Sequence, residues 1–411
     1  MQSSIKSVDS SLLQADQIWH AAVKSVNGET ATQKALADEK EDAWRYVLAV
    51  GKGASAMLKG AIDSIASDAH ALLVTKYHHV IQALADDARV KIIESGHPMP
   101  DRNSLRAGRK VREFVSAIPS DASLLILVSG GASALVEDPH AGIDLATLQN
   151  LSERLLADGY SIDQINLVRI AISRIKGGKL LQQFHGRLVR VYALSDIPGD
   201  DADLIGSGIA AIKAPVVASF DIPSGIKEVM ERARASNDLQ DVSTLDFEYC
   251  ASLVGSNTMA RLAGAEKAEL FGLPVIESNE ILNGDILDLA PKLAARIKAG
   301  KPGVYIWGGE STVCLPTNPG TGGRNQSLAV ALGIEVSDQP GVAGVVAGTD
   351  GTDGPTDAAG GFFHSGMNLS GGRDALLRAD AGTWLKNSDK LFITGPTGTN
   401  VMDLAVVIKQ E

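Results

Sequence analysis

The chain has 411 residues, of which 45% are apolar and 21% charged, and its formal net charge is −11. This composition is typical of a globular protein large enough for two domains, and the acidic balance argues against nucleic acid and anionic membranes as partners. The uncharged stretch 123–136 is too short to span a bilayer, the N-terminus has no apolar signal core, and Cys250 and Cys314 lack metal-ligand spacing, so we expect a cytoplasmic protein.

Short apolar runs alternate with helical patterns through the first half of the chain. A helical pattern covers Leu12 to about Lys40, with a break at Asn27-Gly28. Strands are predicted at 44–50, 71–75, 90–95, 124–129 and 189–196, with helices from GKGASAM to about Ala66, at 103–117 and at 165–176. This alternation predicts an α/β domain with a Rossmann-like, doubly wound and mostly parallel sheet.

The composition changes near residues 213–245, where a polar helix and linkers are predicted. We therefore expect one domain over residues 1–240 and a second α/β domain over 241–411. The predicted elements of the second domain are FEYCASLVGSN, LPVIES, a helix at 286–299, VYIWGGEST, a helix at 326–334, VAGVVAGTDGTDG and LFITGPTGTN.

Six of the predicted strands end in loops of small and polar residues. These loops lie in AVGKGAS, LVSGGASA, LSDIPGDD, IWGGEST, VAGTDGTDG and ITGPTGTN. Ligands of open α/β sheets bind at the carboxyl ends of the strands, so six such ends indicate a shared site for a polyanion. The alternative is that Gly and Ser only form the turns between strands and helices.

The segment GKGASA (51–56) matches a weak dinucleotide-binding pattern. The next predicted strand ends at Thr75-Lys76, so no carboxylate is available for an NAD ribose, although Lys76 could face an NADP phosphate. A second interpretation is that Lys52, between Gly51 and Gly53, neutralises a carboxylate or a transferring phosphoryl group. The alternative is a solvent-exposed lysine in a turn.

A second glycine loop, SGGASA (129–134), lacks the lysine of a Walker A motif. It can still form a nest of backbone N–H groups around a phosphate, or it can be an ordinary tight turn. Its expected cofactor contacts are Ser129, Gly130, Gly131 and Ser133. We also expect Asn257, at the end of FEYCASLVGSN, to contact the cofactor.

Carboxylates and one arginine complete the candidate site. Asp196 in SDIPGDD could accept a hydroxyl proton, and Asp350 and Asp353 in GTDGTDG could face Mg²⁺ that is held partly by substrate phosphates. The spacing of GTDGTDG excludes an EF-hand. Arg324 follows flexible glycines in GTGGRNQS, where a guanidinium could bind a carboxylate or phosphate in two hydrogen bonds.

These motifs resemble, in the same order, those of the class II glycerate 2-kinase family, whose members carry a C-terminal MOFRL domain. The resemblance covers about residue 12 to the end and rests on VGKGASAM, SGHPMPD, LVSGGASAL, INLVR with SRIKGGKL, LSDIPGDD, GGESTV, GGRNQSLA, AGTDGTDGPTDAAG and TGPTGTNVMDL. It implies ATP- and Mg²⁺-dependent phosphorylation of D-glycerate at its 2-hydroxyl, in a cleft between two α/β domains. It also implies that Lys52 and Arg324 are needed for activity.

The chain departs from the family pattern at three places, of which the first could narrow the glycine nest slightly and the other two affect the expected substrate more than the reaction. The chain has Ala132, Ile209-Ala210 and Ser327 where the family has glycine, Pro-Thr and glutamate. A related sugar acid is therefore an alternative substrate. A hydroxypyruvate reductase and a ligand-binding sensor without catalysis are the alternative functions. We expect a small-molecule substrate, no nucleic-acid or membrane partner, and a monomer or small homo-oligomer.

Overall fold

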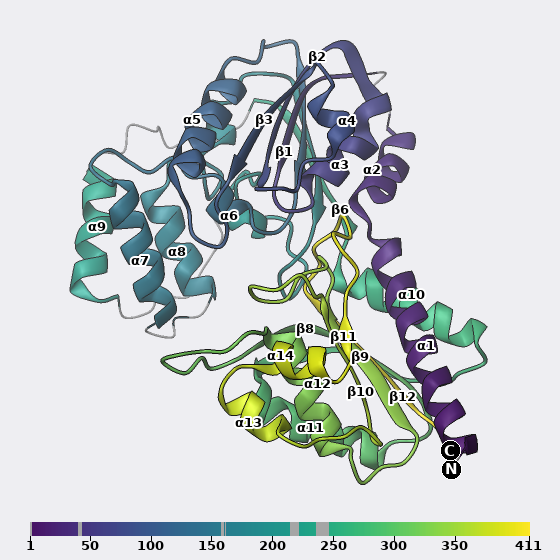
Figure 1. The fold of residues 1–411 in the computed structure, drawn as a ribbon. Helices are drawn as coiled ribbons and strands as arrows, with labels where there is room; N and C mark the ends of the chain where they lie inside the picture. Colours follow the sequence, from purple (N-terminus) through teal and green to yellow (C-terminus); the bar gives the residue numbers. More distant parts are fainter. Residues whose placement is uncertain (1, 40–42, 158–159, 161, 214–221, 236–245) are drawn as a thin grey trace. The chain divides into compact units, whose positions relative to one another are not determined.

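A computed structural model describes residues 2–39, 43–157, 160, 162–213, 222–235 and 246–411 (Figure 1). Its chain divides into two compact units, one of residues 28–254 and one of residues 1–27 with 255–411. The boundary expected near residue 240 lies outside the described residues. The units instead divide after residue 254, and the first 27 residues belong with the C-terminal unit. The reason is packing, because a strand after residue 246 extends the first sheet and the N-terminal helix covers the second.

The unit of residues 28–254 contains a six-stranded sheet of the order β3-β2-β1-β4-β5-β6. Every pair from β3 to β5 runs parallel, as the alternation of strands and helices predicted. The strands are β1 (Trp44–Val50), β2 (Ile65–Lys76), β3 (Val90–Ser95), β4 (Ser123–Val128), β5 (Leu188–Leu194) and β6 (Glu248–Gly255). This strand order is that of a doubly wound Rossmann sheet.

Helices cover both faces of this sheet. Val47 and Ala49 pack with α2 (Gly28–Ala37) and α3 (Ala54–Ala61), while Leu48 and Val50 pack with α5 (Arg102–Ser116) and α6 (Ala132–Leu135). Successive residues of a strand point to opposite faces, so a strand covered on both sides is apolar throughout. The helices α7 (Leu145–Ala157), α8 (Ile162–Ile172) and α9 (Ser224–Ala235) form a separate layer with its own core, and α4 (Gln82–Ala85) is a single turn.

The second unit contains a mixed sheet of the order β11-β10-β9-β12-β8-β7. Only β7 and β8 pair in parallel, and the other neighbours are antiparallel. The strands are β7 (Val275–Asp285), β8 (Gly303–Thr312), β9 (Val342–Gly348), β10 (Gly360–His364), β11 (Leu391–Phe392) and β12 (Asp403–Lys409). The helices are α1 (Gln2–Ser25), α10 (Asn257–Leu270), α11 (Ile286–Ala299), α12 (Arg324–Glu335), α13 (Gly372–Leu377) and α14 (Ala381–Asn387).

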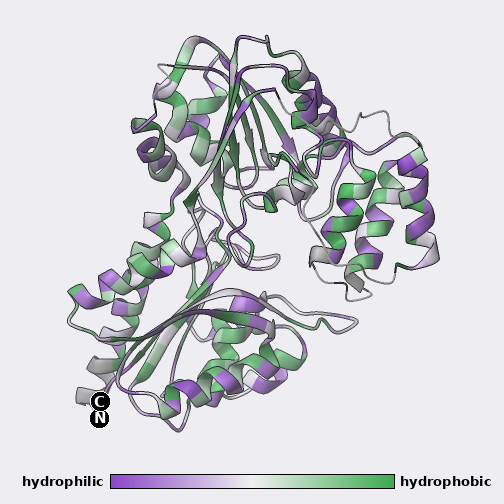
Figure 2. Ribbon diagram, turned by 180° about the vertical axis from the view of Figure 1, so that it is seen from behind, coloured by the Kyte–Doolittle hydropathy of each residue, from purple (hydrophilic) through white to green (hydrophobic). Residues whose placement is uncertain are grey.

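This sheet is also covered on both faces. One face packs against α11 and α12, and the other against α1 and α10. Figure 2 shows hydrophobic and hydrophilic residues interspersed along the helices of the protein. Within the described part of the chain, no helix is both long and apolar enough to cross a membrane.

The structure differs from the predicted elements at several places. The helix after GKGASAM ends at Ala61, and β2 begins at Ile65, six residues before its prediction. The strand predicted in LFITGPTGTN is only Leu391–Phe392. The strands β10 and β12 were not predicted, although β12 lies in the middle of its sheet. Glycines at the start of β10 weaken its local pattern, and pairing with neighbouring strands places both β10 and β12 in the sheet.

Candidate active site

Three of the candidate loops follow adjacent strands of the first sheet. Val50 of β1 pairs with Val128 of β4, and Val128 pairs with Ala193 of β5. Parallel strands present their carboxyl ends at one edge, so the loops that follow β1, β4 and β5 lie side by side. Lys52 lies two residues after Val50, and Asp196 lies three residues after Ala193. The structure thus brings together the loops of Lys52, SGGASA and Asp196.

The first two loops are joined by backbone hydrogen bonds. Lys52 donates its N–H to the carbonyl oxygen of Gly130 (2.9 Å), and Gly53 donates its N–H to Ser129 Oγ (2.9 Å). Gly51 has a φ of +129°, and a Cβ atom there would lie 2.2 Å from Ser129 Oγ. Only glycine fits this position. The N–H groups of Lys52 and Gly53 therefore join this loop to the SGGASA loop.

The Lys52 side chain lies along the second loop, beside His97. A Cβ atom on Gly131 would lie 3.0 Å from Lys52 Cγ, 3.1 Å from His97 Cδ2 and 3.2 Å from His97 Nε2. Gly131 also has a φ of +81°, which L-residues rarely adopt. The absence of a side chain at Gly131 therefore leaves room for the side chains of Lys52 and His97, which both lie against the SGGASA loop.

A buried lysine of the SRIKGGKL motif fixes the position of this loop. Lys176 is fully buried, donates from Nζ to the carbonyl oxygen of Ser133 (2.7 Å), and forms an ion pair with Glu137. Burial lowers the pKa of Lys176 to about 8, against the opposing effect of Glu137. The helix predicted to run to residue 176 ends at Ile172, so Lys176 lies in the turns that follow it.

Hydroxyl groups extend this network to the end of the SGGASA loop. Ser133 Oγ and Ser207 Oγ lie 2.7 Å apart, and Ser207 donates to Asn166 Oδ1 (2.8 Å). Ser207 has a φ of +58°, and its carbonyl oxygen accepts the N–H of Gly177 (3.0 Å). Such a strained residue persists only where its surroundings hold it. The glycine loop is thus positioned by groups far apart in the sequence.

The second unit contains a separate charged cluster around Arg324, the first residue of α12. Arg324 donates from Nε to Asp403 Oδ2 (2.6 Å) and from Nη2 to Asp403 Oδ1 (2.9 Å). Arg324 Nη1 lies 3.1 Å from Glu310 Oε1. Burial lowers the pKa of Arg324, but Asp403 and Glu310 outweigh it and raise this pKa above its usual range. The guanidinium is therefore a permanent cation in a fixed orientation.

The two carboxylates expected to face Mg²⁺ have local partners. Asp353 is buried and accepts the N–H groups of Asn325 (3.2 Å) and Gln326 (2.8 Å) at the start of α12. Burial is the main cause that raises the pKa of Asp353 to about 7. Asp350 Oδ1 accepts from both the N–H and the hydroxyl of Thr352, each at 3.0 Å. The GTDGTDG loop thus caps the helix that carries Arg324.

Both oxygens of Asp353 accept hydrogen bonds from the first residues of α12, so this carboxylate is fixed at the start of the helix. Among the residues that the structure describes, no group of three or more His, Cys, Asp or Glu side chains is arranged to hold a metal ion. Mg²⁺ in kinases is commonly held by one or two carboxylates and the substrate phosphates, so Asp350 alone is compatible with it.

Asn257, expected to contact the cofactor, is fully buried. Its side chain donates to the carbonyl oxygens of Val401 (2.9 Å) and Asp403 (3.0 Å), and it accepts from Arg261 Nε (2.9 Å). A fully buried amide with these partners joins α10 to the start of β12. Asn257 therefore supports the backbone of Asp403 through the hydrogen bond to its carbonyl oxygen.

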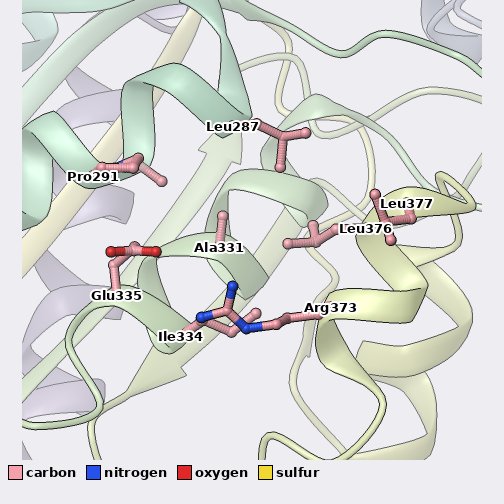
Figure 3. Close-up of a pocket in the computed structure, with 9 residues that line it drawn as sticks. Leu287, Pro291, Ala331, Ile334, Glu335, Arg373, Leu376 and Leu377 are labelled. Atoms are coloured by element: carbon pink, nitrogen blue, oxygen red, sulfur yellow. The ribbon is translucent and has the colours of Figure 1, made fainter.

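A hollow of about 250 Å³ lies elsewhere in the second unit, between α11, α12 and α13 (Figure 3). Leu287, Leu376 and Leu377 contribute apolar side chains, and the charged lining residues are Glu335 and Arg373. It is at the opposite end of α12 from Arg324. None of the candidate residues lines it.

The fold and these clusters define a two-domain α/β protein with charged side chains in the loops after its parallel strands and at the start of α12. Residues 14–239 match the model of a domain of unknown function, DUF4147, and residues 303–403 match that of the MOFRL family. The chain belongs to the glycerate kinase family that combines these two domains. The resemblance drawn from the motifs is thereby confirmed.

Relatives of known name match almost the whole chain. A D-glycerate 2-kinase of Thermotoga maritima is 34% identical, with 95% of this chain and 97% of the relative covered. A protein named putative hydroxypyruvate reductase, from Agrobacterium vitis, is 34% identical over 88% of this chain and 98% of the relative. The crystal structure of a glycerate kinase from Thermotoga maritima covers 97% of this chain and 99% of its own, with a TM-score of 0.80 and 31% identity.

Proposed function

We propose that this chain transfers a phosphoryl group from ATP to the 2-hydroxyl of D-glycerate. Its family membership and its 34% identity to a D-glycerate 2-kinase support this proposal. The observation that carries it is the position of Lys52 and Asp196 in the loops that follow β1 and β5, the two strands on either side of β4, which the SGGASA loop follows. Phosphoryl transfer needs alignment and charge neutralisation more than covalent catalysis, and this arrangement supplies both.

Each residue of the first cluster has a distinct task. The 2-hydroxyl oxygen forms the new bond to the γ-phosphorus as the bond to the β–γ bridging oxygen breaks, and ADP leaves. Lys52 stabilises the charge on the transferring group, since a fixed cation is most effective where charge develops. Asp196 accepts the hydroxyl proton. Lys176 holds the carbonyl of Ser133, so the glycine loop keeps its shape while the ligands bind.

Arg324 binds the carboxylate of the hydroxy acid in this proposal. Its planar fork suits a carboxylate, and Asp403 orients it. Asp350 would hold Mg²⁺ together with the nucleotide phosphates, and the cation would neutralise part of their charge. Asp353 takes no part in metal binding and supports α12 instead.

Reduction of hydroxypyruvate is the second candidate, because GKGASA follows β1 and opens α3, as in dinucleotide-binding proteins. Two observations disfavour it. Strand β2 ends at Lys76, without an acid for a ribose. The N–H groups of Lys52 and Gly53, which would have to face a pyrophosphate, bind the neighbouring loop.

A coupled ADP-release assay with ATP, Mg²⁺ and a panel of hydroxy acids led by D-glycerate tests the proposal, with phosphorus NMR of the product. We expect a 2-phospho ester from D-glycerate, and a loss of turnover of about 100-fold or more in Lys52→Met. Lys59→Met is the matched control, because Lys59 lies on α3 and pairs with Glu29 (3.6 Å). NADH oxidation by hydroxypyruvate, without ADP release from any acid, would overturn the proposal in favour of the reductase.

A further inference from the structure

Arg324 contacts two carboxylates that differ strongly in accessibility. The Asp403 side chain is 1% exposed and binds the guanidinium with both oxygens, at 2.6 Å and 2.9 Å. The Glu310 side chain is 51% exposed and approaches Nη1 with Oε1 at 3.1 Å. A buried, two-point pair is held far more firmly than a half-exposed pair that water and salt can screen.

The surroundings of Asp403 keep it in place. It begins β12 and pairs with Gly309 of β8 and Gly348 of β9. Its carbonyl oxygen accepts from Asn257 Nδ2 (3.0 Å), and Asn257 is held in turn by Arg261. A Cβ atom on Gly308 would lie 1.6 Å from Asn257 Oδ1, so the amide fills the space beside the strand. Asp403 cannot leave Arg324 without disturbing the middle of the sheet.

Glu310 is less constrained. It lies two residues before the end of β8, and its carboxylate meets Arg324 from the solvent side of the pair. The carboxylate of a ligand could replace Glu310 at Arg324 Nη1. The guanidinium would then still face two carboxylates, so the local net charge would stay the same. A neutral ligand could not replace Glu310 in this way, because it would leave the guanidinium with one carboxylate fewer.

We propose that Asp403 is a positioning residue that presents Arg324, and that Glu310 occupies Nη1 until the carboxylate of the substrate replaces it. The inference rests on the proposed function for the identity of the acid. The exchange makes a carboxylate on the ligand a requirement for binding. Glu310 thus acts as a competitor inside the protein, and it lowers the affinity for the acid while excluding neutral polyols.

The variant Glu310→Gln tests the exchange. We expect it to bind D-glycerate about three to ten times more tightly than the unaltered protein in calorimetry without nucleotide, and to lower the KM for the acid without changing the KM for ATP. Asp338→Asn is the matched control, since Asp338 is an exposed carboxylate that pairs with Lys298 (2.8 Å) in the same unit. Asp338→Asn removes the same negative charge and should leave both the affinity and the KM for D-glycerate unchanged.

Equal or weaker acid binding in Glu310→Gln would overturn the exchange, and so would the absence of carboxylate binding in the unaltered protein. An equal gain in the Asp338→Asn control would also overturn it, because the effect would then be long-range. Tighter binding in Glu310→Gln without ADP release would support the inference while the proposed function fails. If ADP is released but Glu310→Gln changes neither the affinity nor the KM for D-glycerate, the proposed function stands and only the exchange is overturned.

The positioning role of Asp403 predicts a different pattern. Asp403→Asn should raise the KM for the acid about tenfold or more, with the KM for ATP unchanged, and Asp403→Glu should restore part of the loss. Equal loss for both substrates in a folded Asp403→Asn protein would indicate a structural role only and overturn the assignment. Since burial could prevent Asp403→Asn from folding, Glu310→Gln, altered at a half-exposed site, keeps the exchange testable.

Discussion

Lys52 and Gly131 approach one another so closely that a Cβ atom on the glycine would lie 3.0 Å from the Cγ of the lysine. The lysine follows β1 and the glycine follows β4, and the two strands are neighbours in the first sheet. The space that the absent side chain leaves is therefore the space in which Lys52 lies. The contact explains why a glycine loop and a lysine loop occur together at this edge.

A side chain at Gly131 should impair catalysis more than stability. In Gly131→Ala the methyl group pushes against Lys52 and His97, so we expect turnover to fall by about tenfold or more in the ADP-release assay. Gly142→Ala is the matched control, because the φ of Gly142 (+84°) is close to that of Gly131 (+81°). A Cβ atom on Gly142, however, would have no neighbouring atom within 4 Å. Both variants should lose about 1 kcal/mol of unfolding free energy to backbone strain. Equal turnover in the two would contradict the steric explanation.

Removal of Lys176 should destabilise the protein strongly. Lys176→Met leaves Glu137 buried without its cation, which typically costs about 3–5 kcal/mol of unfolding free energy in urea titrations. The double variant with Glu137→Gln should recover part of this loss. Lys179→Met is the control, because Lys179 donates only to the carbonyl oxygens of Ile170 and Ser173, each at 2.7 Å. A loss in Lys179→Met as large as in Lys176→Met would show that hydrogen bonds, not the orphaned charge, account for it.

Asp353 should make stability depend on pH. Its pKa is raised to about 7 in the folded chain, above the unfolded value of about 3.9, so the folded state binds more protons between these two values. Stability therefore falls as pH rises from about 4 to 7, by at most about 1.4 kcal/mol per pH unit from this group. Asp353→Asn should lack this contribution in urea titrations at several pH values. A difference between the two proteins that does not shrink as pH rises would contradict the assignment.

Asn257 should matter for stability and not for nucleotide binding. Asn257→Ala leaves the carbonyl oxygens of Val401 and Asp403 without a donor, at a cost of about 1–3 kcal/mol of unfolding free energy. The KM for ATP should stay unchanged, because the amide is fully buried. A large rise in this KM at unchanged thermal stability would restore the cofactor role that the sequence suggested.

The outline of the first domain was predictable because short segments of its sequence indicate its strands and helices. Apolar runs separated by helical patterns predict a parallel sheet, and loops after its strands lie at one edge whatever the details of packing. The loops of Lys52 and Asp196 lie at the same edge of the sheet for this reason. The second sheet was predicted less well, because the isolated segment DLAVVIK gives no sign that β12 lies between β8 and β9.

The sequence by itself determined where glycines, cations and carboxylates follow apolar strands, since backbone freedom and side-chain charge are properties of single residues and short segments. Only the tertiary structure decided what each group faces. It placed Lys176 on the carbonyl of Ser133, Asp353 on the start of α12 and Asp403 on Arg324. These partners are distant in the sequence, and which of them meet depends on burial and strand order, which no local pattern records.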